Sequence, residues 1–164
     1  MRKDFGSKPW FYPMPVLVIG TYGADGKPDA MTAAWGGLYD ADKVVLCLSA
    51  GHKTTKNIQA KGAFTVSFAD AAHVVSSDYV GIVSANTEPA KMEKSGFHTT
   101  KSEFVDAPLI DELPVALECK FLIILLFVNF SYCIAARLKK RGRFIRTTPA
   151  ESRCFCLWIL AELY

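Results

Sequence analysis

The chain has 164 residues, 51% of them hydrophobic and 21% charged, and a formal net charge of +3. This length allows one domain with a sizeable core but not two, and the composition argues against a disordered chain. The five cysteines are an odd number, and the closest pair, Cys154 and Cys156, lacks a zinc-binding spacing. No secretory signal is visible at the N-terminus, so we expect a cytoplasmic protein without a metal site.

Short apolar runs separated by turn residues predict a mainly β domain with only minor helices. The first two runs, residues 14–22 and 29–35, should pair as a hairpin. Gly26 lies in the turn between them and supplies the positive φ that such turns need. We expect Gly36 and Gly37 to end the second strand.

The remaining elements are expected in a similar pattern of short segments. Strands are predicted at residues 43–49 and 63–68, and a further one begins at 113–120. A tight turn entering a short helix is predicted at residues 50–60, a loosely defined helix at 73–84, and a short helix at 89–95 that Gly96 stops.

The window from Ser49 to Asn57 has the features of a phosphate site. A strand ends there, Gly51 allows a turn, and a helix begins with hydroxyl and lysine side chains in its first turn. Exposed backbone N–H groups and the helix dipole favour an anion at such a place. The candidates are Ser49, Ala50, His52, Lys53, Thr54, Thr55 and Lys56. The alternative is a capped helix with solvated lysines.

The preceding strand is built of small residues, and its candidates are Met31, Thr32, Ala33, Ala34 and Trp35. Small side chains leave room beside a sheet for a flat ring, which could send a phosphate toward Thr54 and Lys56. Tight packing of this strand against a neighbouring helix is the alternative.

The order of several sequence blocks resembles the flavin reductase-like family, with flavoredoxin-type members the most similar. The blocks are PMPVLVIGTYGADGKPDAMTAAWGG, LCLSAGHKTTKNI, SSDYVGIVSA, KMEKSGF and APLIDELPVALECK, and together they span roughly residues 5–120. The resemblance implies a split β-barrel that binds FMN and is usually a homodimer. It places the flavin ring along Met31 to Trp35 and the phosphate near Ser49 to Lys56. The Thr32 hydroxyl and the amides of Ala33 and Ala34 would then donate to the ring and tune the reduced flavin.

The function that the resemblance implies is that of an NAD(P)H-dependent flavin reductase. NADH or NADPH would reduce FMN by hydride transfer, and the reduced flavin would pass its electrons to an acceptor or a partner oxygenase. No side chain is expected to act as a catalytic acid or base. The alternative is a non-enzymatic, flavodoxin-like electron carrier that holds FMN tightly and exchanges electrons with a redox partner protein. We expect no nucleic-acid partner.

Residues 121–164 differ in composition from residues 1–120. The first 120 residues carry 12 Lys and Arg against 14 Asp and Glu, whereas the last 44 carry 7 against 2 and only one glycine, Gly142. The resemblance stops after Lys120, so we interpret 1–120 as an incomplete FMN-binding domain and 121–164 as an atypical basic and apolar tail. A frame change in the coding sequence is the favoured origin. A divergent barrel end with residues 121–130 as a buried strand comes next, and a membrane anchor is less favoured.

Overall fold

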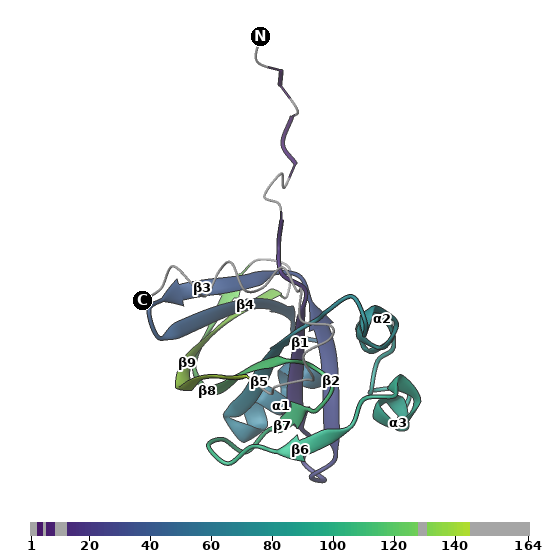
Figure 1. Ribbon diagram of the computed structural model, residues 1–164. Helices are drawn as coiled ribbons and strands as arrows, with labels where there is room; N and C mark the ends of the chain where they lie inside the picture. The colour runs from purple at the N-terminus through teal and green to yellow at the C-terminus, as the bar shows by residue number, and fades with distance from the viewer. Residues whose placement is uncertain (1–2, 5, 9–12, 128–130, 145–164) are drawn as a thin grey trace.

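The computed structural model describes residues 3–4, 6–8, 13–127 and 131–144. Its main feature is a seven-stranded antiparallel sheet with the strand order β2-β1-β5-β8-β9-β4-β3, accompanied by a small sheet of β6 and β7 (Figure 1). The strands are β1 (Leu17–Tyr22), β2 (Pro28–Ala33), β3 (Gly36–Asp40), β4 (Lys43–Ser49), β5 (Ala63–Phe68), β6 (Thr99–Lys101), β7 (Pro108–Ile110), β8 (Val115–Phe127) and β9 (Ser131–Phe144). The helices are α1 (Lys53–Lys61), α2 (Val74–Ile82) and α3 (Lys91–Ser95).

The predicted hairpin is confirmed. β1 and β2 pair antiparallel from Leu17 opposite Ala33 to Tyr22 opposite Pro28. Gly26 has a φ of 76°, the left-handed conformation that the turn requires and that glycine adopts without strain. The strands predicted at 43–49 and 63–68 are also confirmed, as are all three helices within a few residues of their predicted bounds.

The sheet curls on itself because the chain joins its two edges directly. β2 ends at Ala33 and β3 begins at Gly36, although these strands stand at opposite ends of the strand order. The Cys47 amide donates to the Trp35 carbonyl at 2.8 Å, which ties this connection to β4. The expectation that Gly36 and Gly37 end the second strand is wrong, since β2 ends at Ala33 and both glycines belong to β3. A Cβ on Gly36 would lie 2.7 Å from the Leu46 side chain, so close packing, and not a turn, requires this glycine.

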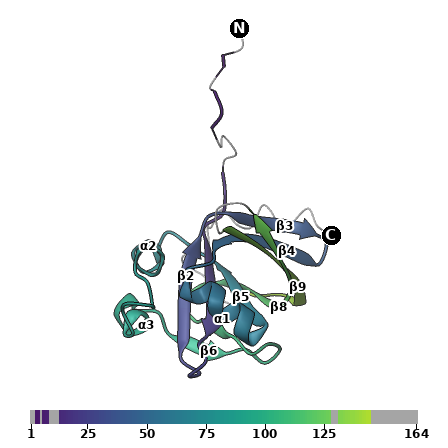
Figure 2. The ribbon, with the colours of Figure 1, turned by 180° about the vertical axis from the view of Figure 1, so that it is seen from behind.

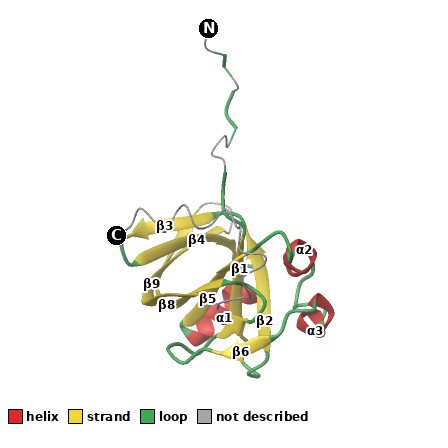
Figure 3. Ribbon diagram, viewed as in Figure 1, coloured by secondary structure: helices red, strands yellow, loops and turns green. Residues whose placement is uncertain are grey.

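The interior of the curled sheet is the main core. Leu17 and Ile19 of β1 point into it, whereas Val18 between them packs on the outer face, as the two-residue period of a strand dictates. α1 adds Ile58 to the same core. Figures 2 and 3 show α2 and α3 next to each other outside β2, where Val80 and Phe97 pack with Val18 in a second cluster.

Residues beyond 120 continue the sheet as far as the structure describes them. β8 runs through residue 121 to Phe127, and β9 pairs with β8 on one side and with β4 on the other. The sequence suggested that the C-terminal part of the split barrel is atypical or missing. In the structure, β8 and β9 occupy that part of the barrel as far as residue 144. The predicted burial of the 121–130 segment is wrong for Leu122 and Ile123, which are exposed. Residues 128–130 and 145–164 lie outside the described residues, and the frame change stays a prediction.

None of the helices within the described residues is long and apolar enough to cross a membrane.

Candidate functional site

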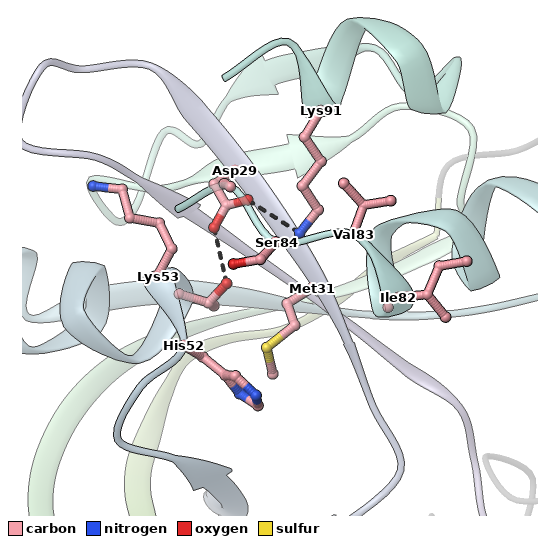
Figure 4. A pocket seen from close by; sticks show the side chains of 11 residues that line it. Asp29, Met31, His52, Lys53, Ile82, Val83, Ser84 and Lys91 are labelled. Atoms are coloured by element: carbon pink, nitrogen blue, oxygen red, sulfur yellow. Dashed lines mark hydrogen bonds and ion pairs between the residues drawn. The ribbon is translucent and has the colours of Figure 1, made fainter. Parts of the chain in front are cut away.

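A cavity of about 150 Å³ lies where β2, the start of α1 and the segment from α2 to α3 meet. Figure 4 shows its labelled side chains, among which Asp29 and Lys91 point toward each other. The lining residues come from four separate segments and are Asp29, Met31, His52, Lys53, Thr54, Gly81, Ile82, Val83, Ser84, Ala85 and Lys91.

The start of α1 offers backbone donors to this cavity. The first hydrogen bond that returns into the helix is from the Lys56 amide to the His52 carbonyl, at 3.2 Å. The amides of Lys53, Thr54 and Thr55 precede it and have no acceptor within the helix. His52 stands at the N-cap position and makes no side-chain cap. These amides, together with the helix dipole, form a place that favours an anion.

The threonine hydroxyls predicted for the phosphate have other acceptors. Thr54 Oγ1 donates to Asp29 Oδ2 at 2.9 Å, and Thr55 Oγ1 donates to the Ser49 carbonyl at 2.8 Å. Each hydroxyl has one hydrogen, so neither can donate to a phosphate without giving up this bond. The two threonines therefore hold the turn and the helix start in place.

The charged candidates differ in position. His52 and Lys53 line the cavity, although in Figure 4 the Lys53 side chain extends away from the other labelled residues. Lys56 is exposed and does not line the cavity. The same holds for Ser49, whereas Ala50 is half-buried outside the lining.

The small-residue strand is divided between two faces. Met31 and Ala33 are buried in the main core. Thr32 points the other way and donates its hydroxyl to the Ser77 carbonyl of α2 at 2.5 Å. Ala34 and Trp35 are exposed beyond the end of β2. Thr32 thus packs against a helix, and its hydroxyl could donate to a ring only by giving up this bond. Its place at a flavin ring stays a prediction.

Gly81 allows α2 to approach β2 this closely. A Cβ built on Gly81 would lie 3.1 Å from the Thr32 Cβ. The approach places Gly81 and Ile82 in the cavity wall.

Asp29 and Lys91, the charged pair of the cavity, are not among the site residues that the sequence predicts. Lys91 Nζ lies 3.4 Å from Asp29 Oδ1, and both side chains are almost completely buried. Burial lowers the pKa of the Lys91 ammonium below its usual range, and the nearby Asp29 carboxylate opposes that shift. The sequence indicates neither residue as part of a site, because a charged residue beside a turn and a charged residue in a short helix are usually solvated.

Of the 12 predicted site residues, the structure brings four together at the cavity: Met31, His52, Lys53 and Thr54.

Comparisons with known proteins agree with this fold. The family described as "Flavin reductase like domain" matches residues 10–127. The structure of flavoredoxin from Desulfovibrio vulgaris (Miyazaki F) is 30% identical with a TM-score of 0.81, and the match covers 88% of this chain and 76% of that one. Flavoredoxin from Methanosarcina acetivorans is 26% identical with a TM-score of 0.75, covering 88% and 75% of the two chains.

A more distant structure shows the same fold. The 2-nitrobenzoate 2-nitroreductase of Pseudomonas fluorescens is 22% identical with a TM-score of 0.72, covering 82% of this chain and 66% of that one. No curated protein matches the sequence. The matched residues and the mainly β split barrel together show that this chain belongs to the flavin reductase-like family.

Proposed function

We propose that this chain is an FMN-binding oxidoreductase that takes electrons from NADH or NADPH. The observation that carries the proposal is the convergence at one cavity of the first amides of α1, which have no acceptor within the helix, the outer edge of β2 and the Lys91 ammonium. The family membership and the similarity to two flavoredoxins support the choice of a flavin.

The residues fit the parts of FMN in turn. The amides of Lys53 and Thr54 suit the phosphate, because they are donors at a positive helix end. β2 is the first strand of the main sheet and pairs only with β1 among the described residues, so its other edge offers backbone groups to the polar rim of a flavin. The exposed residues Ala34 and Trp35 continue that edge and leave space for the ring.

Bound FMN would supply the redox chemistry, namely acceptance of a hydride and release of electrons. The chain would bind the phosphate at α1, orient the ring along β2 and limit access through the segment from α2 to α3. No side chain needs to gain or lose a proton for this role.

The test begins with the purified full-length protein freed of flavin. Quenching of flavin fluorescence should show that FMN binds more tightly than riboflavin, because riboflavin lacks the phosphate that the α1 amides would hold. FMN affinity no better than riboflavin affinity would contradict the phosphate placement. Anaerobic mixing of the FMN-loaded protein with NADH or NADPH should then bleach the flavin absorbance.

The alternative is that bound FMN only carries electrons between partner proteins. The structural similarity to two flavoredoxins keeps this alternative open. Flavin that is not bleached by either nicotinamide, yet is reduced by a photochemical donor, would favour the carrier.

We also propose that the protein is a cytoplasmic homodimer. Support comes from the exposed apolar side chains of Trp35, Leu38 and Tyr39 at and beside the edge strand β3, which a second copy could cover. Light scattering after gel filtration measures the mass in solution, and a monomer at micromolar concentration would contradict the dimer.

A further inference from the structure

The wall of the cavity includes a buried carboxylate whose hydrogen-bonding capacity is only partly used. Asp29 is 4% exposed and Lys91 is 3% exposed. Asp29 Oδ2 accepts the Thr54 hydroxyl at 2.9 Å. Asp29 Oδ1 accepts no hydrogen bond in the described part of the chain, and its nearest charged partner is Lys91 Nζ at 3.4 Å.

Such an arrangement leaves specific groups for a ligand. Each carboxylate oxygen can accept about two hydrogen bonds, and a lysine ammonium has three donors. A buried polar atom without a partner costs free energy, so a bound group that completes these bonds is favoured. The cavity therefore presents an acceptor, Asp29 Oδ1, beside a donor, Lys91 Nζ (Figure 4).

A hydroxyl group matches this pair better than a phosphate does. A hydroxyl donates one hydrogen and accepts at its oxygen, so it can satisfy Asp29 and Lys91 together. A phosphate only accepts and carries negative charge, which the buried Asp29 carboxylate repels. The ammonium and the carboxylate nearly balance each other, so an uncharged ligand part is preferred.

The size of the cavity points to the same part of the ligand. Its volume is about 150 Å³. Pockets that enclose a whole drug-sized ligand measure roughly 300–1,000 Å³, so a three-ring flavin with its side chain does not fit inside. A short polyol chain is of suitable size.

We propose that Asp29 and Lys91 form a hydroxyl-binding subsite that holds the ribityl chain of the flavin. Asp29 Oδ1 accepts a hydrogen bond from a ribityl hydroxyl, and Lys91 Nζ donates to a hydroxyl oxygen. The ring then lies outside the cavity, along β2 toward Trp35, and the phosphate lies at the start of α1. This inference rests on the proposed function. It assigns the ribityl chain, and neither the ring nor the phosphate, to the cavity.

Three flavins separate the parts of the ligand without any mutation. Lumiflavin has the ring alone, riboflavin adds the ribityl chain, and FMN adds the phosphate. For the unaltered full-length protein, we expect riboflavin to bind at least about tenfold more tightly than lumiflavin, because hydrogen bonds to charged groups are the strong ones. Equal affinities for riboflavin and lumiflavin would overturn the subsite, whereas binding of none of the three would overturn the proposed function and the subsite with it.

A double variant, Asp29→Asn with Lys91→Met, tests the two residues directly. It removes both buried charges together, so neither is left without its partner. We expect the affinities for riboflavin and FMN to fall by the same factor, about tenfold, with lumiflavin affinity unchanged. Lys94→Met is the matched control on the same helix, because Lys94 is exposed and pairs with Glu88 outside the cavity.

Each other outcome contradicts the proposal. A loss confined to FMN would place the phosphate at Asp29 and Lys91, and an equal loss for lumiflavin would place the ring there. Unchanged affinity for all three flavins would make the pair purely structural. If the double variant does not fold, the comparison of the three flavins on the unaltered protein still decides the proposal, because it needs no substitution.

Discussion

Asn86 and Gly51 join two segments that border the cavity. Asn86 Nδ2 donates to the Gly51 carbonyl at 3.1 Å, which joins the loop between α2 and α3 to the turn before α1. The bond is exposed, so it is weak in net free energy. On one side of the loop, α2 is fixed to β2 through Thr32, and on the other side α3 is fixed through Lys91. The loop between these two fixed points carries Ser84 and Ala85 of the cavity wall, and the Asn86 bond holds it to the turn before α1.

Asn86→Ala should therefore speed flavin binding and release. Removing one exposed hydrogen bond is worth about 0.5–1.5 kcal/mol, which predicts roughly a two- to tenfold rise in the rate constants. Stopped-flow fluorescence with FMN measures both rates. Thr87→Val is the control, because the Thr87 hydroxyl bonds only within the loop, to the Ser84 carbonyl. Rates equal to those of the unaltered protein would mean that the Asn86 bond does not limit access.

Ala33 and Ala34 should respond differently to the same substitution. Ala33 is buried in the core, so Ala33→Phe overpacks it and should lower the free energy of unfolding by about 1–3 kcal/mol or more. Ala34 is exposed, so Ala34→Phe should leave stability nearly unchanged and reduce FMN affinity by obstructing the ring. Urea unfolding and flavin titration of both variants check this. A stable Ala34→Phe variant with full FMN affinity would place the ring elsewhere.

These two alanines also show what the sequence could and could not predict. Strand period and turn residues are local, so the hairpin and the start of α1 were predictable from neighbouring residues alone. Which face of β2 is covered depends on α2, which is remote in sequence, so the residues around Thr32 do not predict that a helix covers it. Asp29 and Lys91 meet only because α3 folds back onto β2. Nothing near either residue in the sequence indicates that pairing.

Gly81→Ala should destabilise the protein although it lies in a helix. Alanine normally improves a helix by about 1 kcal/mol relative to glycine. Here the new Cβ would lie 3.1 Å from the Thr32 Cβ, and Thr32 is held by its hydrogen bond to Ser77. We expect the crowding to exceed the gain in helix propensity and lower the free energy of unfolding by about 1 kcal/mol. Gly37→Ala is the control, since nothing lies within 4 Å of a Cβ there. A more stable Gly81→Ala variant would show that α2 can shift away from β2.

Stability should fall at alkaline pH through Cys119. Burial raises the pKa of the Cys119 thiol from 9.0 to about 12, with the Glu118 charge contributing in the same direction. Above pH 9 the unfolded chain releases this proton while the folded chain retains it, so the unfolded state binds fewer protons and unfolding becomes more favourable. The contribution of the Cys119 thiol to the free energy of unfolding is therefore fully present below pH 9 and is lost progressively as the pH approaches 12. Urea unfolding between pH 8 and about 11 should show a smaller decline for Cys119→Ala than for the unaltered protein, and parallel curves would contradict the assignment.

The last prediction concerns how much of the chain after residue 120 the fold needs. β9 lies between β8 and β4, so a chain that ends at Lys120 loses the strand that pairs with β4 and part of the strand that pairs with β9. Unpaired strand edges and the core face left open by the loss of Ile134 and Ala136 favour aggregation. We expect that truncated chain to be insoluble. A chain that ends at Phe144 keeps every strand of the described sheet, and we expect it to stay soluble and to bind FMN as the full-length protein does. Expression of both, followed by gel filtration and flavin titration, separates the two cases. A soluble, flavin-binding chain ending at Lys120 would show that residues 1–120 form a complete domain without β9.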